Sequence, residues 1–182
     1  MVNIYKLKLT LLQQGILRLL FIKTGTSLNA RAIAKALNVS QPAVSKALPL
    51  LKKEEFLKMV KDKESKRLAI ELNRDDFQLL WLKRADNLKQ IYESGLAKYL
   101  YDSFPGDTIF LFGSYAMGED TIKSDLDLAV IGAKEKSLNL TAFEKILQRP
   151  IIINYYPSLQ NIDKHLRNNI LNGMVLKGAV EL

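Results

Sequence analysis

Two aspartates, Asp125 and Asp127, are the residues of this sequence best suited to chemistry. They stand two positions apart in the run Asp-Leu-Asp-Leu, and residues two apart in a strand share one face. No Lys or Arg lies between them, so the two carboxylates would repel each other without a bound cation. Oxygen-rich sites of this kind suit Mg²⁺ that bridges substrate phosphates. We therefore expect Asp125 and Asp127 to be metal ligands, with Mg²⁺ as the cofactor.

A second segment, Gly113-Ser114, is suited to binding an anion. The apolar run at residues 109–112 predicts a buried strand, and Gly113-Ser114 then opens a short helix whose backbone amides and Ser hydroxyl bind anions readily. Ten residues separate Ser114 from Asp125. A P-loop is excluded, because Glu119-Asp120 stands where that motif has Lys-Ser/Thr.

The segment TIFLFGSYAMGEDTIKSDLDLAVIG resembles the nucleotidyltransferase superfamily related to DNA polymerase beta. In that superfamily a strand, Gly-Ser, a short spacer and Asp-hydrophobic-Asp recur, and the small "minimal" nucleotidyltransferases are the most similar. The resemblance covers residues 105–182. It implies that Gly113 and Ser114 bind a nucleoside triphosphate. It also implies that Asp125 and Asp127 are catalytic residues that ligate Mg²⁺ for in-line attack on the alpha phosphorus.

One position departs from the superfamily pattern. Active relatives place a third carboxylate on the next strand, which is predicted at residues 151–156, and its place falls to Asn154. An amide neither accepts a proton as a base nor adds negative charge to a metal site. The one histidine, His165, stands in a polar segment without a paired acid, so we expect it on the surface. Whether this domain is an active enzyme stays open on these residues.

The first part of the chain predicts helices and a hairpin. Apolar spacing indicates one helix near residues 7–23 and another over 29–38, and Ser40 is a good N-cap for a third. Alternating apolar residues on either side of the charged segment 61–67 predict two strands joined as a hairpin. This order is the winged helix-turn-helix arrangement.

The stretch from Ala30 to Leu72 resembles the DNA-binding domain of MarR- and ArsR-type regulators. It departs from them at Glu55, where Gly often precedes the wing, and at Pro49 inside the third helix. Residues at the start of such a helix reach base edges, and basic wing residues bind phosphates or the minor groove. The DNA-binding candidates are Ser40, Gln41, Ala43, Ser45, Lys46, Lys61, Lys63, Lys66 and Arg67.

The charge distribution favours the same end of the chain. The net charge is +8, and residues 1–75 hold 15 Lys and Arg against 6 Asp and Glu, while residues 76–182 hold 12 against 13. Such asymmetry favours double-stranded DNA as partner of the first part. The absence of Cys excludes a disulfide scaffold and a thiolate metal site. No apolar run is long enough for a membrane span and no signal peptide is recognisable, so we expect a cytoplasmic protein.

Residues 75–104 contain no Pro and one Gly, with apolar residues at spacings of three and four. They predict one long amphipathic helix that connects two domains and pairs with a second copy, giving a homodimer. The expected fold class is α+β. The expected domains are a winged helix-turn-helix at 1–73, a connecting and dimerisation helix at 74–104, and a nucleotidyltransferase-like domain at 105–182 with a mixed sheet and flanking helices.

Three functions are compatible with these features. The leading interpretation is a DNA-binding protein similar to transcriptional regulators, whose nucleotidyltransferase-fold domain binds a nucleotide and Mg²⁺. The alternative is an active nucleotidyltransferase that moves a nucleoside monophosphate from a triphosphate to a protein, nucleic-acid or small-molecule acceptor. A third interpretation is an interaction protein of the toxin-antitoxin type.

Overall fold

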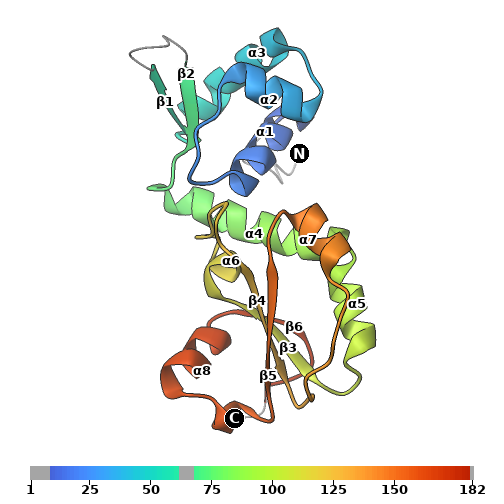
Figure 1. Ribbon diagram of the computed structural model, residues 1–182. Coiled ribbons are helices and arrows are strands. Elements are labelled where there is room, and N and C mark those ends of the chain that lie inside the picture. The colour runs from blue at the N-terminus through green and yellow to red at the C-terminus, as the bar shows by residue number, and fades with distance from the viewer. Residues whose placement is uncertain (1–8, 62–67, 181–182) are drawn as a thin grey trace, which may run out of the picture. The chain divides into compact units, whose positions relative to one another are not determined.

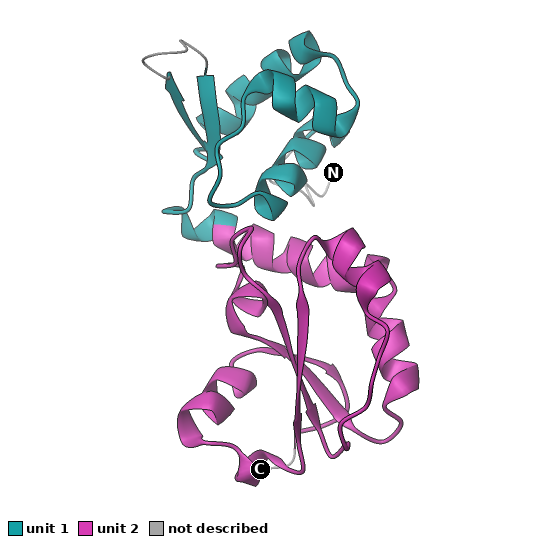
Figure 2. Ribbon diagram, in the orientation of Figure 1, with its two compact units in different colours: residues 1–79 teal, residues 80–182 magenta. Residues whose placement is uncertain are grey.

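The computed structural model describes residues 9–61 and 68–180. The chain divides into two compact units, residues 1–79 and 80–182 (Figure 1, Figure 2). The first unit holds a two-stranded sheet and the second a four-stranded one, both accompanied by helices. The expected α+β class is therefore confirmed. Within the described ranges, no helix is both long and apolar enough to cross a membrane.

In the described part of the first unit, three helices precede a hairpin. Its elements are α1 (Leu11–Ile22), α2 (Ala30–Leu37), α3 (Gln41–Lys53), β1 (Leu57–Lys61) and β2 (Leu68–Leu72). Each helix begins after a side chain that accepts a hydrogen bond from the backbone amide three residues on, which is the usual N-cap bond. These caps are Thr10, Asn29 and Ser40. With β1 and β2 antiparallel, the unit is the winged helix-turn-helix that the sequence predicts.

One core holds these helices against the hairpin. Its completely buried residues come from all three helices and from β2; they include Ile16, Ile33, Val44, Leu51 and Ile70. The segment before α2 also pairs with β2, because the Leu28 amide donates to the Ile70 carbonyl at 2.9 Å and the Ile70 amide donates to the Leu28 carbonyl at 2.7 Å. The hairpin is thus fixed to the helices by both apolar packing and backbone hydrogen bonds.

The two departures from the regulator pattern leave the fold intact. Glu55 adopts a left-handed conformation, with φ at 59°, which is the conformation that Gly reaches without strain. The Asn73 side-chain amide donates to the Glu55 carbonyl at 2.7 Å and stabilises this turn into β1. Pro49 lies inside α3, yet α3 continues to Lys53.

The prediction of one long helix over residues 74–104 is wrong in one respect, because the structure has two helices there. α4 (Phe77–Glu93) and α5 (Leu96–Ser103) are separated at Gly95, which has a φ of 81° in the left-handed region. A glycine takes this conformation at no steric cost and so ends the first helix. Leu96 and Leu100 of α5 are buried in the core beneath the sheet, so this segment packs with the second unit.

The second unit is a mixed sheet with helices on both faces (Figure 1). Its remaining elements are β3 (Thr108–Phe112), α6 (Gly113–Met117), β4 (Leu126–Ile131), α7 (Thr141–Leu147), β5 (Ile151–Tyr156), a short 3-10 helix (Leu159–Asn161), α8 (Lys164–Leu171) and β6 (Met174–Lys177). The strand order is β5-β4-β3-β6, with β3 antiparallel to β4 and β6, and β4 parallel to β5. The end of β3 therefore lies beside the starts of β4 and β6, and β5 starts at this same end of the sheet.

The two faces of this sheet have different cores. Leu126 and Leu128 pack with residues of α5 and α7. Phe112 and Ala129 pack with Ile170 of α8. Because side chains alternate along a strand, Asp127 falls on the same face as Ala129, at the end of the sheet where α6 begins.

The break at Gly95 is testable by substitution. Gly95→Ala adds a Cβ that meets no atom within 4 Å, so its cost comes from the left-handed backbone alone. We expect a loss of about 1–2 kcal/mol in the free energy of unfolding, measured by urea denaturation followed by circular dichroism. As a control, Gly15→Ala inside α1, where the nearest side-chain atoms lie 3.9 Å away, should gain about 0.5–1 kcal/mol. A rise in both helix content and stability for Gly95→Ala would contradict this account.

Candidate functional site

Gly113 and Asp127 lie against each other at the end of the sheet. Phe112, the last residue of β3, pairs with Asp127 of β4, and α6 begins directly after it. Gly113 has a φ of 72°, and a Cβ added there would lie 2.6 Å from Asp127 Oδ2. A side chain at position 113 would therefore be strained and would also collide with the carboxylate. The structure thus brings Gly113, Ser114 and Asp127 together, as the spacing predicts.

The two aspartates interact electrostatically. Asp125 is exposed just ahead of β4, and Asp127 is partly buried as the second residue of the strand. Burial raises the pKa of the Asp127 carboxyl above its usual value, and the negative charge of Asp125 raises that pKa further. Both effects disfavour the charged carboxylate. A cation between the two carboxylates would relieve both.

The register of β5 places both Asn154 and Ile152 on the face of the sheet that carries Asp127. Asp127 pairs with Ile152, and Asn154 pairs with Ala129, one alternate position further along the same face. The Asn154 side-chain amide donates to the Leu128 carbonyl at 3.5 Å. Neither Asn154, the expected place of the third carboxylate, nor Ile152 supplies a third acid on this face.

The donor set fits a magnesium ion that is shared with a substrate. Asp125 and Asp127 both provide carboxylate oxygens, which Mg²⁺ prefers, and Mg²⁺ is commonly held by one or two carboxylates together with substrate phosphates. In the described part of the chain, no group of three His, Cys, Asp or Glu residues is arranged to hold a metal. Asp125 and Asp127 would therefore supply part of a coordination shell, and phosphate oxygens and water would complete it.

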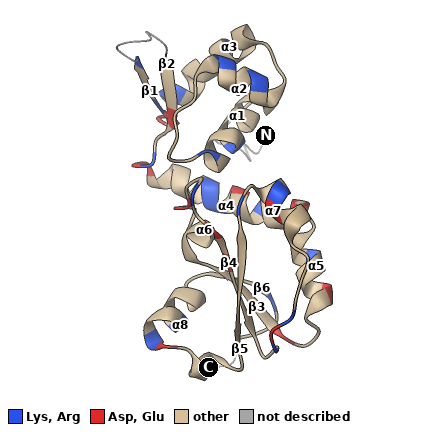
Figure 3. Ribbon diagram, in the orientation of Figure 1, with Lys and Arg blue, Asp and Glu red and all other residues tan. Residues whose placement is uncertain are grey.

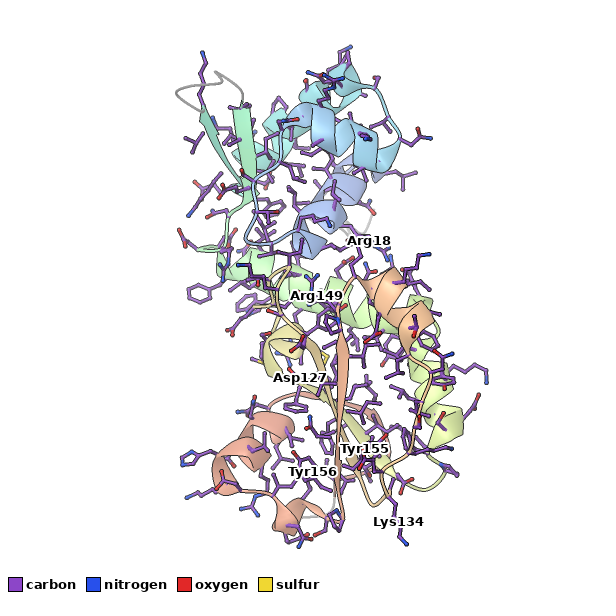
Figure 4. All side chains as sticks on the ribbon, viewed as in Figure 1. Arg18, Asp127, Lys134, Arg149, Tyr155 and Tyr156 are labelled. Carbon is purple, nitrogen blue, oxygen red and sulfur yellow. The ribbon has the colours of Figure 1, made fainter. Side chains whose placement is uncertain are left out.

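Sequence reasoning missed a buried ionic cluster next to this site. Asp120, on the connection between α6 and β4, forms ion pairs with Lys83 at 2.8 Å and with Arg149 at 2.9 Å. Asn87 Nδ2 donates to Asp120 Oδ1 at 2.8 Å. All four residues are buried. Figure 4 shows Arg149 close to α4 and Asp127 beside α6. No local sequence signal indicated this cluster, because Lys83 stands beside Arg84 and Asp120 stands beside Glu119.

The DNA-binding candidates of the first unit are exposed in α3 and at the hairpin. Gln41, Ser45 and Lys46 are exposed and Ala43 is partly buried. Ser40 is also exposed, and its hydroxyl accepts the capping bond from the Ala43 amide at 3.3 Å. Lys61 is exposed at the end of β1. Lys63, Lys66 and Arg67 lie outside the described residues.

A groove of about 840 Å³ runs between α3 and the hairpin. Leu48 of α3 and Met59 and Leu68 of the hairpin line it, together with Gln41 and Ser45. Three basic residues that the sequence reasoning missed also line this groove, namely Arg31, Lys52 and Lys53.

Lys52 could have been found from the sequence. It follows Gln41 by eleven residues and Ser45 by seven, which is about three and two helical turns, so these residues share one face of α3. Arg31 comes from α2 and reaches the groove only through the fold. Two of the predicted base-reading residues, Gln41 and Ser45, therefore line the same groove as three basic residues.

The raised pKa of Asp127 has a consequence for stability. A carboxyl whose pKa is raised in the folded state stabilises the fold when it is protonated and costs stability as the pH rises through that pKa. We therefore expect Asp127→Asn, in EDTA at pH 7, to raise the thermal unfolding midpoint by about 1–4 °C. The gain should shrink as the pH falls and should vanish below the unfolded pKa of about 4, where Asp127 is protonated in both states. A less stable variant at pH 7 would contradict the burial and repulsion described above.

Comparison with known proteins adds a family and several structures. Residues 93–177 match the family model described as "Nucleotidyltransferase domain". No curated protein matches the chain. Among solved structures, the Adhesin competence repressor (AdcR) from Streptococcus pyogenes is 28% identical and is matched over 57% of this chain and 72% of its own, with a TM-score of 0.44.

Two further solved structures are similar to this chain. The S. aureus MepR-DNA complex is 25% identical, over 53% of this chain and 82% of that chain, with a TM-score of 0.38. The zinc-responsive MarR family member ZitR from Lactococcus lactis is 26% identical, over 58% of this chain and 70% of its own, also with a TM-score of 0.38. Residues 93–177 of the chain thus match a nucleotidyltransferase domain, and a winged helix-turn-helix unit precedes them.

Proposed function

We propose that this protein is a DNA-binding protein similar to transcriptional regulators, and that its nucleotidyltransferase domain binds a nucleoside triphosphate together with Mg²⁺. Gly113 and Ser114 bind the triphosphate, and Asp125 and Asp127 ligate the metal. The first unit binds double-stranded DNA through α3 and the hairpin. We also propose that this protein works in the cytoplasm.

The arrangement at the end of β3 supports the nucleotide half of this proposal. Gly113 leaves room for the Asp127 carboxylate beside the first turn of α6, so phosphate oxygens near Ser114 can share a metal with Asp127. Asn154, at the expected place of the third carboxylate, is an amide on the same face of the sheet, and Ile152 beside Asp127 is apolar. The site then lacks the base that would deprotonate an acceptor, which favours binding over turnover.

The groove between α3 and the hairpin supports the DNA half. Gln41 and Ser45 are positioned to read base edges, and Arg31, Lys52 and Lys53 are positioned to bind phosphates. Figure 3 shows Lys and Arg on α2 and α3 of the first unit. This concentration of positive charge is what binding to a polyanion requires.

The family match favours a second candidate function, which is transfer. An acceptor hydroxyl would attack the alpha phosphorus in line, the bond to the leaving pyrophosphate would break, and the hydroxyl proton would pass to a base. Asp125 and Asp127 would then be catalytic as well as metal-binding. Ile152 counts against this candidate, because it supplies no base.

A homodimer is part of the proposal. Trp81 and Tyr92 of α4 are 66% and 55% exposed, although large aromatic side chains are commonly buried. They lie eleven positions apart, about three turns on one helix face. A second copy that pairs along α4 would cover both, and a two-fold dimer matches a two-fold DNA site.

Nucleotide binding is tested by calorimetry with each of the four ribonucleoside triphosphates. We expect saturable binding with Mg²⁺, and a dissociation constant that rises about tenfold or more in EDTA or in Asp127→Ala, because the shared metal is lost. Binding that is equal in Asp127→Ala and in the unmodified protein would contradict the site. Incubation with α-labelled triphosphate separates the two candidates, because incorporation that depends on Asp127 would establish transfer in place of binding alone.

DNA binding is tested by its salt dependence. Phosphate contacts give a slope of log affinity against log salt of about −0.9 per contact. We therefore expect Lys52→Ala and Lys53→Ala each to reduce the slope by about one, whereas Lys145→Ala, an exposed cation on α7 of the second unit, should leave it unchanged. Gln41→Ala should reduce sequence preference more than overall affinity. Binding that does not depend on salt, or that is absent, would overturn the DNA assignment.

A further inference from the structure

The buried cluster around Asp120 binds the segment that joins the two halves of the nucleotide site. Asp120 lies between Ser114 and Asp125 in the sequence, on the connection 118–125 between α6 and β4. Its side chain is 1% exposed, yet it is ionically paired with Lys83 and Arg149. Lys83 Nζ also donates to the Asp120 backbone carbonyl. Both the side chain and the backbone of Asp120 are thereby fixed.

α4 holds the same connection at a second point. A Cβ added to Gly118 would lie 2.6 Å from the Leu80 carbonyl oxygen and 2.9 Å from the Arg84 backbone nitrogen. Gly118 therefore packs directly on the backbone of α4, where no side chain would fit. Its φ of 78° reinforces the requirement for glycine.

Asn87 connects the segment 118–125 to α6, the helix that carries Ser114. Its Nδ2 donates to the Tyr115 carbonyl in α6 at 2.8 Å and to Asp120 Oδ1 at 2.8 Å. Tyr115 is the residue next to Ser114. One side chain of α4 therefore binds both the end of the site that carries Ser114 and the connection that leads to Asp125.

We propose that Asp120 is a positioning residue of the nucleotide site. Held by Lys83, Asn87 and Arg149, it fixes the connection 118–125 so that the triphosphate-binding Gly113-Ser114 and the metal-binding aspartates stand at the separation that a nucleotide with its metal requires. This role rests on the proposed function of the site. Asp120 contacts neither nucleotide nor metal and acts through the backbone on either side of it.

The ionic character of this cluster favours a positioning role for Asp120 over a purely stabilising one. A buried ion pair is often no more stable than apolar residues of the same size, because desolvation offsets the attraction. The Asp120 carboxylate is bound by donors from α4 and by Arg149, two residues before β5. Both its orientation and its depth in the core are therefore fixed. An apolar anchor would hold the connection in the core but would leave its rotation and register less well determined.

Two variants weaken the grip without adding an unpaired buried charge. Asn87→Ala removes two hydrogen bonds and no charge. Lys83→Met removes one cation and leaves Asp120 paired with Arg149 at 2.9 Å, so the bridge from Lys83 to the connection is lost while the carboxylate keeps an ion-pair partner. Leu100→Ala is the matched control, because Leu100 is 1% exposed in the core of the same unit and lies outside this cluster.

The experiment compares nucleotide affinity with stability in the full chain. With Mg²⁺ present and well below the unfolding midpoint, we expect Asn87→Ala to raise the dissociation constant about tenfold and Lys83→Met to raise it further. Leu100→Ala should lower the midpoint at least as much as Asn87→Ala while changing the dissociation constant less than about twofold.

The possible outcomes separate the two proposals. If the unmodified protein binds nucleotide and both cluster variants bind it equally well, the positioning role is overturned and the proposed function stands. The positioning role is also overturned if Leu100→Ala weakens binding as much as Asn87→Ala does, because general loosening then explains the loss. If the unmodified protein binds no nucleotide with Mg²⁺, the proposed function fails and the positioning role fails with it.

Discussion

The second unit depends on the buried carboxylate of Asp120. Lys83 and Arg149 are both buried, and the Asp120 carboxylate pairs with both charges, which offsets part of the cost of burying them. Breaking such a pair typically costs about 3–5 kcal/mol. Lys83 lies in α4, and Arg149 lies two residues before the edge strand β5. The Asp120 side chain therefore joins a helix to the edge of the sheet. The residues proposed to bind nucleotide flank Asp120 in the sequence, and their spacing follows from where it is held.

Local features of the chain were readable from the sequence, whereas long-range pairings were not. The cap at Ser40 and the alternating strands predicted the winged helix, because these signals act over three or four residues. The strand, Gly-Ser and Asp-x-Asp were also local signals, and the structure brings Gly113 against Asp127. Asp120 and Lys83 lie 37 residues apart, and no local pattern indicates that a buried Lys and a buried Asp are partners.

Strand register explains why the third position is hard to assign from sequence. The sequence predicts that residues 151–156 form a strand but not which residue stands beside Asp127, because sliding a parallel strand changes every pairing without changing its composition. The structure pairs Asp127 with Ile152 and Ala129 with Asn154, and neither of these two β5 residues supplies a carboxylate on this face. Gly95 was ambiguous for a related reason. A lone Gly is tolerated within a helix or ends one, and here the packing of Leu96 and Leu100 beneath the sheet favours the break.

The charged residues of the two units act on phosphate in opposite ways. In the first unit, basic residues line an open groove, and an anion can approach them directly. In the second unit, Lys83 and Arg149 are buried against Asp120, while the carboxylates of Asp125 and Asp127 face the place proposed for the triphosphate. These carboxylates repel phosphate until a divalent cation lies between them, and desolvation of Asp127 strengthens that requirement. Nucleotide binding should therefore require Mg²⁺, whereas DNA binding should need no divalent cation and should weaken as salt rises, so that removal of Mg²⁺ separates the two proposed activities in one protein.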